Sequence, residues 1–309
     1  MQQKIAFMGT PLFAVPILKY MYQNGYETCA VYTQPPNKSN RGQKIEKSPV
    51  HIFAETLNLN IRTPHTLKNN KIELDYIKSL NLDLVVVVAY GQIIPKEFLS
   101  LSKNGFVNLH ASILPRWRGA APIQRALMSQ DKETGISVMK INEKLDEGNI
   151  SRIFKTNILD NENATSLSDR LSILAAENIC IIIDEILDQE ITFKPQDHSK
   201  ATYAKKIQKN EGHINWNENA DKIIGKINGL YPYPGGYFLF KGERYKILRA
   251  EKSFSKSKAG EVLTNDLEIA CGSNSIKILE IQREGKKPQN INEFLPGSQI
   301  KKGFNLLNV

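Results

Sequence analysis

An amide and an imidazole lie two residues apart at the end of a short apolar stretch, where Asn108 and His110 follow Gly105-Phe106-Val107. Side chains alternate along a strand, so these two groups project from the same face. A carboxylate follows later in the chain, at Asp146 in a Lys-Leu-Asp-Glu-Gly turn. A carboxylate that meets an imidazole orients the ring and favours its charged form. An Asn amide can donate a hydrogen bond to a developing oxyanion. The trio therefore predicts a reaction that passes through an oxyanion.

Each of the three residues also has a simpler interpretation when it is taken alone. His110 fits a structural histidine with satisfied hydrogen bonds, and Asp146 fits a solvated acid in a tight turn, since a glycine follows it two positions later. The combination of Asn108, His110 and Asp146 is what indicates a catalytic site.

Alternating strands and helices are predicted for residues 1–189, and they explain how the trio is positioned. The Val-rich run 82–89 is bounded by turn signals and is typical of a central parallel strand buried on both faces. We expect a doubly wound, mostly parallel α/β sheet, Rossmann-like, with a hairpin appended at one edge. Ligands of such sheets bind at the carboxyl ends of the strands. The expected strands are 4–8, 28–33, 60–63, 82–89, 106–110, 136–141 and 150–156. The expected helices are 11–22, with Thr10 as its N-cap and Pro11 at its first position, 48–57, 67–80 and 165–189.

The pattern changes after residue 189. Residues 190–209 lose periodicity and hold five lysines against two acids, which predicts a basic linker. Residues 210–309 are predicted to form a helix at 220–230 followed by short strands with glycine-containing turns, which favours a small C-terminal β-barrel, OB-like, as a second domain. The expected strands are 236–240, 245–251, 260–263, 267–271 and 276–282.

Composition limits the classes of protein and partner. The chain has 309 residues and a formal net charge of +9, a surplus that favours a polyanionic partner, although a lysine-rich surface explains it equally well. The three cysteines, Cys29, Cys180 and Cys271, have no metal-ligand spacing, so we expect reduced thiols and no metal. The N-terminus lacks a signal-peptide core and the apolar runs are too short to cross a bilayer, so we expect a cytoplasmic protein that does not bind membranes.

The run 108–116, with Asp146 placed 36 residues after His110, resembles the signature of the folate-dependent formyltransferases. The Asn-x-His pattern is shared by several formyl-transferring enzymes, whereas the extension Arg-Trp-Arg-Gly-Ala-Ala-Pro is more discriminating. The longer run that includes this extension is similar to those members of the family that act on initiator tRNA. Two departures, Ala111 and Ile113, leave the proposed chemistry untouched. Further matching runs lie at 7–11, 88–91, 116–125, 202–207 and 231–235, so the resemblance covers nearly the whole chain.

The resemblance implies a reaction and a folate site. The formyl group of 10-formyltetrahydrofolate would move to the α-amino group of methionine on initiator tRNA, giving N-formylmethionyl-tRNA and tetrahydrofolate. Asn108 and protonated His110 would stabilise the oxyanion, and Asp146 would position groups and handle protons. A nicotinamide cofactor is not expected, because the glycine-rich fingerprint is absent after the first strand. The implied folate-binding residues are Val88, Ala89, Tyr90, Ser112, Leu114 and Pro115.

The resemblance also implies tRNA contacts. The long connection 34–47 holds four basic residues against one acid; connections of this length are usually functional or disordered. By resemblance it contacts the acceptor end of the tRNA. The linker and the C-terminal β-barrel, as the tRNA-binding domain, would follow the acceptor stem through phosphate contacts. The implied tRNA-binding residues are Arg41, Lys38 and Lys44 in the connection and Lys205, Lys206 and Lys209 in the linker, and a monomer is expected.

Three alternatives remain open from the sequence. A formyltransferase acting on an amino sugar or another small amine needs the trio but neither the Arg41 connection nor a basic second domain. A 10-formyltetrahydrofolate hydrolase uses water in place of the amine. An RNA-binding protein could keep the fold without catalysis, although the intact trio argues against it.

Overall fold

The computed structural model describes residues 3–39 and 44–307, which form two compact units. The first unit comprises Met1–Gly119, Gly135–Thr156 and Ser168–Tyr203, and the second comprises Ala120–Thr134, Asn157–Leu167 and Ala204–Val309. The chain thus passes between the units several times, and the long helix α6 (Ala164–Leu187) has residues in both.

The first unit is built on a seven-stranded sheet in the order β10-β9-β7-β6-β1-β2-β5. Neighbouring strands from β7 to β5 are parallel, and β9 joins β7 antiparallel. The prediction of a doubly wound, mostly parallel sheet with an edge hairpin is confirmed. The strands are β1 (Lys4–Gly9), β2 (Glu27–Tyr32), β5 (Ile61–Arg62), β6 (Leu84–Val88), β7 (Phe106–His110), β9 (Glu133–Lys140) and β10 (Ile150–Asn157).

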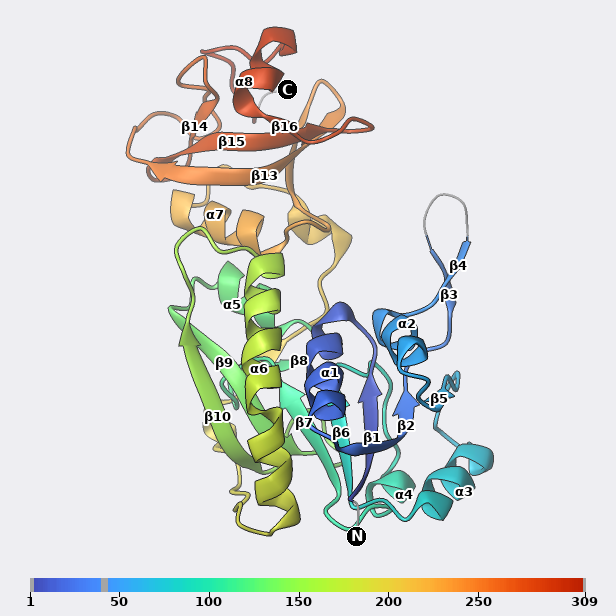
Figure 1. The fold of residues 1–309 in the computed structure, drawn as a ribbon. Helices are drawn as coiled ribbons and strands as arrows, with labels where there is room; N and C mark the ends of the chain where they lie inside the picture. The colour runs from blue at the N-terminus through green and yellow to red at the C-terminus, as the bar shows by residue number, and fades with distance from the viewer. Residues whose placement is uncertain (1–2, 40–43, 308–309) are drawn as a thin grey trace. The chain divides into compact units, whose positions relative to one another are not determined.

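Helices cover both faces of this sheet. Figure 1 shows α1 (Val15–Gln23) and α6 side by side on one face, and the Ser172 hydroxyl of α6 donates to the Phe13 carbonyl at 2.7 Å. The other face packs on α3 (Lys71–Leu80) and α4 (Lys96–Leu99) through an apolar cluster that includes Ala6, Met8, Val85, Val87, Ile77 and Phe98. Every residue of β6 is buried, as expected for a central strand covered on both sides. No helix within the described residues is both long enough and apolar enough to cross a membrane.

The connection between β1 and α1 differs from the sequence prediction. A helix beginning at Pro11 with Thr10 as its cap was expected, but α1 begins at Val15 after a short 3-10 turn. The Thr10 hydroxyl instead donates to the Tyr90 carbonyl at 2.7 Å and accepts from the Gln34 backbone N–H at 3.3 Å. Thr10 therefore ties together the residues that follow three neighbouring strands, and this tertiary use of its hydroxyl replaces capping.

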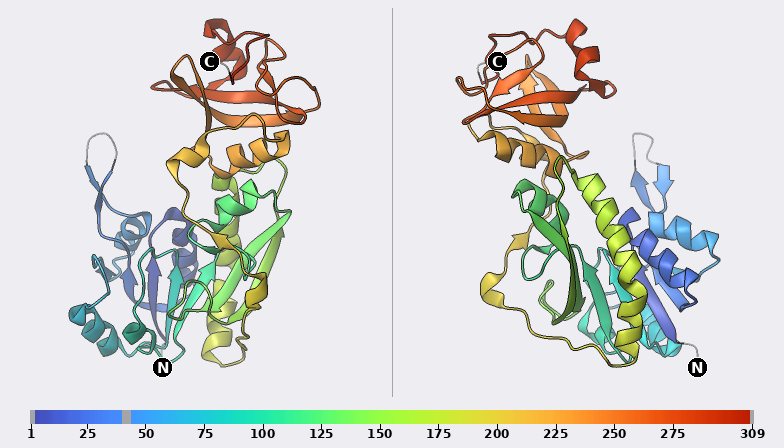
Figure 2. Two further views of the ribbon diagram at one scale, coloured as in Figure 1. Left: turned by 180° about the vertical axis from the view of Figure 1, so that it is seen from behind. Right: turned by 60° about the vertical axis from the view of Figure 1, so that its left-hand side comes forward.

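The segment after α6 folds onto the sheet. Figure 2 shows it returning beside the strands, and Lys194 exchanges two backbone hydrogen bonds with Ile150 of β10, at 2.8 and 2.9 Å. Further along, the Thr202 carbonyl accepts from the Arg118 backbone N–H at 2.9 Å. Residues 190–203, which the sequence predicts to be part of a linker, thus belong to the first unit.

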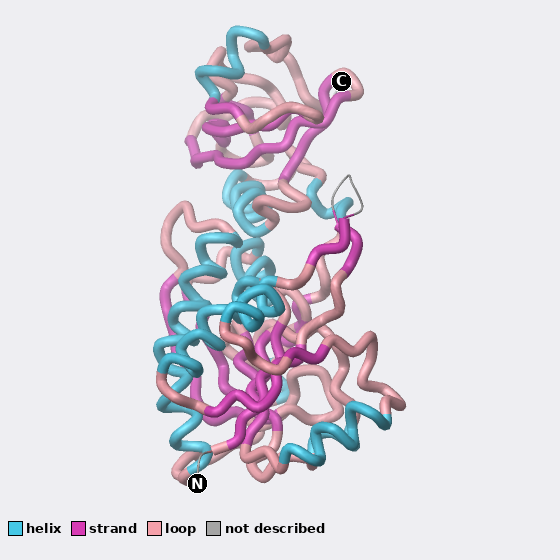
Figure 3. The backbone as a smooth tube through the Cα atoms, turned by 45° about the vertical axis from the view of Figure 1, so that its right-hand side comes forward, coloured by secondary structure: helices cyan, strands magenta, loops and turns pink. Residues whose placement is uncertain are grey.

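The connection after β2 contains a small hairpin. Its strands are β3 (Asn37–Ser39) and β4 (Lys44–Glu46), which pair antiparallel (Figure 3). Lys38 and Lys44 are on these strands, whereas Arg41 lies outside the described residues.

The second unit contains an antiparallel sheet with the strand order β12-β13-β15-β14, and β16 pairs with β15. Its core combines aromatic and branched apolar side chains, among them Trp216, Phe238 and Ile278. The stretch 260–263, expected as a strand, makes only isolated bridges. The elements are α5 (Pro122–Met128), α7 (Ala220–Gly229), β12 (Gly236–Phe240), β13 (Glu243–Ser253), β14 (Glu268–Ala270), β15 (Ser275–Arg283), β16 (Gln289–Asn290) and α8 (Ile291–Phe294).

Candidate active site

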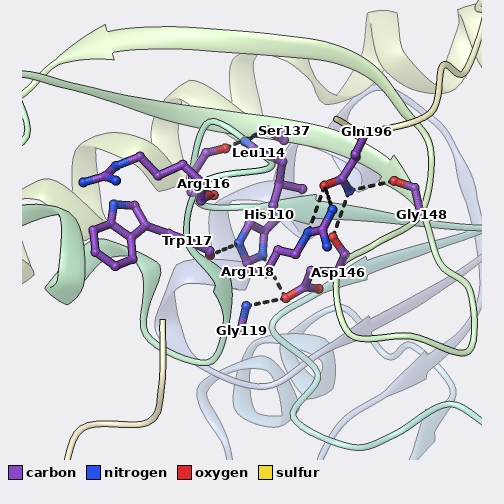
Figure 4. Close-up of polar contacts among 11 residues, drawn as sticks. His110, Leu114, Arg116, Trp117, Arg118, Gly119, Ser137, Asp146, Gly148 and Gln196 are labelled. Atoms are coloured by element: carbon purple, nitrogen blue, oxygen red, sulfur yellow. Dashed lines mark hydrogen bonds and ion pairs between the residues drawn. The ribbon is translucent and has the colours of Figure 1, made fainter. Parts of the chain in front are cut away.

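His110 is the last residue of β7 and is buried, with 7% of its surface exposed. Its Nε2 lies 2.8 Å from the Trp117 carbonyl oxygen (Figure 4). Because a carbonyl only accepts hydrogen bonds, Nε2 carries a proton and donates. The other ring nitrogen, Nδ1, faces Asp146 with 3.7 Å to Oδ2. The structure thus brings His110 and Asp146 together, as the sequence predicts, and assigns a different partner to each ring nitrogen.

Asn108 is two residues earlier on β7 and therefore projects from the same side of the strand as His110. Its position is fixed by neighbours on both sides, Val87 of β6 and Met139 of β9. The side chain is half-buried. Within residues 3–39 and 44–307, no group hydrogen-bonds to its amide. This amide is therefore available to a bound substrate.

Asp146 lies in the turn between β9 and β10 with a left-handed backbone, φ +50°. Its Oδ2 accepts from the Gly119 backbone N–H at 2.7 Å. Two residues later, a Cβ at Gly148 would lie 1.8 Å from the Lys140 carbonyl oxygen, a separation that no side chain tolerates. The glycine that the sequence associated with a tight turn is thus required by close packing of that turn against the end of β9.

The loop after His110 is held by hydroxyl groups. The Ser137 hydroxyl of β9 donates to the Ser112 carbonyl at 2.6 Å and accepts from the Leu114 N–H at 3.0 Å. The Ser112 hydroxyl donates to the Arg116 carbonyl at 2.7 Å. Ser112 and Leu114 are buried, whereas Pro115 is half-buried. The Ser112 hydroxyl is therefore occupied within the loop, which leaves the loop backbone as the part able to line a ligand site.

The residues predicted to hold the folate at the end of β6 differ in exposure. Val88 is buried, Ala89 is exposed with φ +48°, and Tyr90 is buried. Burial raises the pKa of the Tyr90 hydroxyl, and its carbonyl accepts from Thr10. Ala89 is thus the residue of the three that presents its backbone at the carboxyl end of the central strand.

Two further residues belong to this site and were not found by sequence reasoning. Gln196 and Arg118 are buried and hydrogen-bonded to each other, and Gln196 contacts the Asp146 turn. Gln196 lies in a stretch without periodicity, so no sequence signal marks it. Arg118 lies in the Arg-Trp-Arg-Gly run. In the sequence analysis this run only distinguishes members of the formyltransferase family from one another, and no role was predicted for Arg118.

The sequence also matches known families and relatives. Residues 3–182 match the formyl transferase family, and residues 206–299 match the formyl transferase C-terminal domain. A methionyl-tRNA formyltransferase of Pelagibacter ubique (strain HTCC1062) is 62% identical, with 100% of both chains covered. That of Caulobacter vibrioides is 43% identical, over 97% of this chain and 98% of the relative. The chain belongs to the methionyl-tRNA formyltransferase family.

The prediction of a formyl-transferring enzyme is therefore confirmed, and the fold agrees with solved formyltransferases. WlaRD, a sugar 3N-formyltransferase whose structure was determined in the presence of dTDP and 5-N-formyl-THF, superposes with a TM-score of 0.69. The superposition covers 93% of this chain and 100% of WlaRD, at 21% identity. At this identity the likeness shows the shared fold.

The lysines predicted to bind tRNA lie apart from the trio in the chain. Lys205, Lys206 and Lys209 are all exposed. The Lys205 carbonyl accepts from Arg125 Nε and Nη2 at 3.2 and 3.0 Å, and Arg125 also pairs with Glu211 at 2.6 Å. The segment that carries these lysines is thus anchored through its backbone, which leaves the ammonium groups in solvent.

Proposed function

We propose that this chain transfers the formyl group of 10-formyltetrahydrofolate to the α-amino group of methionyl-initiator-tRNA, giving N-formylmethionyl-tRNA and tetrahydrofolate. The observation that carries the proposal is the arrangement at the end of β7: the Nδ1 of buried His110 lies 3.7 Å from Asp146 Oδ2, and the Asn108 amide on the same side of the strand is open to a substrate. Membership of the methionyl-tRNA formyltransferase family supports the choice of acceptor.

The acceptor amine needs no covalent enzyme intermediate. An unperturbed α-amino group has a pKa of about 8, so a useful neutral fraction exists near neutral pH. Its lone pair attacks the formyl carbon, a C–N bond forms, and the carbonyl electrons move onto oxygen. When this tetrahedral intermediate collapses, the carbonyl re-forms and the bond from carbon to the folate nitrogen breaks. The amine loses one proton and the departing folate nitrogen takes one up, so the products are the formylated amine and tetrahydrofolate.

Asn108 and His110 stabilise the oxyanion in this proposal. The open Asn108 amide donates one hydrogen bond, and His110 donates from Nδ1 when both ring nitrogens carry a proton, because Nε2 is committed to Trp117. Each such donor is worth roughly 2.7–4 kcal/mol of barrier lowering. Asp146 faces Nδ1 and is the group placed to position the ring and to accept the proton that the amine releases.

The folate lies at the carboxyl ends of the central strands in this proposal. The exposed, left-handed Ala89 presents its backbone there, and the neighbouring residues Val88 and Tyr90 shape the turn around it. On the other side, the loop containing Ser112, Leu114 and Pro115 contributes backbone and apolar surface. The position agrees with the rule that open α/β sheets bind ligands beyond the carboxyl ends of their strands.

The tRNA is contacted by basic side chains in two places. We assign Lys38, Arg41 and Lys44, on or between β3 and β4, to the acceptor end, and the exposed Lys205, Lys206 and Lys209 to phosphates of the stem. The formal charge of +9 and the salt sensitivity of phosphate contacts fit this assignment. Residues 1–189 would then act as the catalytic domain, 190–209 as a basic connection and 210–309 as the tRNA-binding domain of a monomeric cytoplasmic enzyme.

One assay tests the proposal. Purified protein is incubated with 10-formyltetrahydrofolate and, in parallel, with methionyl-initiator-tRNA, methionyl-elongator-tRNA, an amino sugar nucleotide or water alone. We expect formyl-methionine on the initiator tRNA at a rate far above every other arm. Formylation of the sugar in preference to the tRNA would assign the chain to small amines, and release of formate without an acceptor would make it a hydrolase.

A further inference from the structure

Gln196 uses its whole hydrogen-bonding capacity inside the site. Its Nε2 donates to the backbone carbonyls of Asp146 and Gly148, both at 2.8 Å. Its Oε1 accepts from Arg118 Nε at 3.0 Å and from Arg118 Nη2 at 2.7 Å. A side-chain amide has two donors and two acceptor lone pairs, so none remains for a substrate. The partners also fix the orientation of the amide, because a guanidinium only donates and a carbonyl only accepts.

Arg118 is placed so that its charge is balanced within the same group of residues. Its side chain is 1% exposed, and Nη1 lies 3.3 Å from Glu147 Oε1. Nη2 also donates to His198 Nδ1 at 3.2 Å. Glu147 is the residue between the two carbonyls that Gln196 holds. The Asp146 turn is therefore held at two points. Gln196 hydrogen-bonds to its backbone, and Arg118 pairs with the side chain of Glu147.

The backbone of the Arg118 segment reaches both members of the catalytic pair. The carbonyl of Trp117 accepts from His110 Nε2, and the N–H of Gly119 donates to Asp146 Oδ2 (Figure 4). Arg118 lies between these two residues, and its side chain points to Gln196. The segment 117–119 thus orients both the ring of His110 and the carboxylate of Asp146. Gln196 connects that segment to the Asp146 turn by hydrogen bonds.

The turn needs this support because its backbone is unfavourable. Asp146 has a left-handed conformation, which is disfavoured for residues with a Cβ. Packing of Gly148 against the Lys140 carbonyl holds one side of the turn. Without Gln196, the carbonyls of Asp146 and Gly148 would lose their shared donor, and the Gly119 N–H would be left to hold the Asp146 carboxylate on a less restrained turn.

We propose that Gln196 is a positioning residue for Asp146. By bridging the Asp146 turn to the buried Arg118, Gln196 orients the Asp146 carboxylate toward His110. This inference rests on the proposed function, since it assigns Gln196 a part in the same reaction. It predicts that Gln196 acts on turnover through Asp146 and leaves Asn108, which the sheet holds independently, unaffected.

The test compares Gln196→Ala and Gln196→Glu in the wild-type and Asp146→Ala backgrounds, using residues 1–309 and steady-state formylation of methionyl-initiator-tRNA. The Glu variant keeps the shape and the acceptor for Arg118 but removes both donors to the turn. We expect each Gln196 variant to lower kcat about 10- to 100-fold, with the KM for tRNA and for folate changed less than about twofold. In the Asp146→Ala background, neither should lower the rate further.

The matched control is Asn178→Ala on α6, whose amide also donates to a backbone carbonyl, that of Leu174 at 2.8 Å; its kcat should be unchanged. Amide hydrogen exchange at Gly119 should accelerate in both Gln196 variants and not in the control, and this readout remains valid if the Ala variant is less stable. Equal losses in both backgrounds, or unchanged Gly119 exchange, would overturn the positioning role. Inactive wild-type protein would instead overturn the proposed function, which separates the two failures.

Discussion

The two sides of the proposed catalytic site are held in different ways. Asn108 and His110 are on β7, between β6 and β9, so the backbone ladder places both side chains. Asp146 is in a left-handed turn, and its position depends on contacts from Gln196 and Gly119, which are 50 and 27 positions away, and on packing against the end of β9 at Lys140. A strand positions its residues through local alternation, whereas this turn is positioned by long-range side-chain and packing contacts. The strand side should therefore tolerate distant mutations that disrupt the turn side.

The largest effect should come from the strand side itself. Asn108→Ala removes the open amide, so we expect kcat to fall about 10²–10³-fold, the typical loss for one oxyanion donor. The melting temperature and the dissociation constant for tRNA should stay near wild type, because no hydrogen bond within the described protein is broken. Steady-state kinetics, thermal unfolding and filter binding measure the three quantities. A loss confined to tRNA binding would contradict the assignment.

A smaller loss is expected from the turn side. Gly148→Ala places a methyl group 1.8 Å from the Lys140 carbonyl oxygen, so the turn must shift and carry Asp146 with it. We expect kcat to fall about 10- to 100-fold and stability to fall by about 1–3 kcal/mol. Kinetics and denaturant unfolding measure both changes. Gly297→Ala is the matched control, since nothing lies within 4 Å of its added methyl. Similar results for both glycines would refute the packing argument.

The same contrast applies to the proposed tRNA contacts. β3 and β4 form a backbone ladder, so Arg41→Ala should remove one phosphate contact and leave the hairpin paired. We expect the KM for tRNA to rise several-fold and the slope of log affinity against log salt concentration to shrink by about one, with kcat nearly unchanged. The exposed Lys78 of α3 gives a charge-matched control. A kcat defect equal to the KM defect would place Arg41 in the chemistry.

The smallest effect concerns the segment of Lys205 to Glu211, which is held by side chains as the Asp146 turn is. The hydrogen bond from Arg125 lowers the pKa of Glu211, against an opposing effect of burial. A lowered pKa in the folded state contributes stability above the unfolded value of about 4.3, which is lost as pH falls through the folded value. The melting temperature of wild type should thus exceed that of Arg125→Ala by a constant margin near neutral pH.

This margin should narrow below about pH 4, as Glu211 takes up a proton. Thermal unfolding of both proteins over a pH series measures it. A margin that stays constant into strong acid would show that Arg125 stabilises the segment through the Lys205 carbonyl alone.

Much of the first unit was predictable because its signals are local. The Val-rich run became β6, and the alternation of strands and helices gave a mostly parallel sheet, since burial on both faces requires continuous apolar strands. Thr10 was misjudged because its hydroxyl bonds to Tyr90 rather than to a helix N-terminus. The stretch 260–263 was misjudged because it makes isolated bridges in place of a ladder. In each error a tertiary partner replaced the expected local one.

The sequence by itself determined the residue types of the proposed site, because Asn108 and His110 share a face when side chains alternate along a strand. Membership of the methionyl-tRNA formyltransferase family also follows from runs spread along the sequence. Only the tertiary structure decided that His110 donates from Nε2 to Trp117 and turns Nδ1 to Asp146. Only the tertiary structure joined Gln196 and Arg118 to the Asp146 turn. The physical reason is that these contacts join residues at irregular separations, from 7 positions for His110 and Trp117 to 78 for Arg118 and Gln196, and such contacts leave no periodic trace in the sequence.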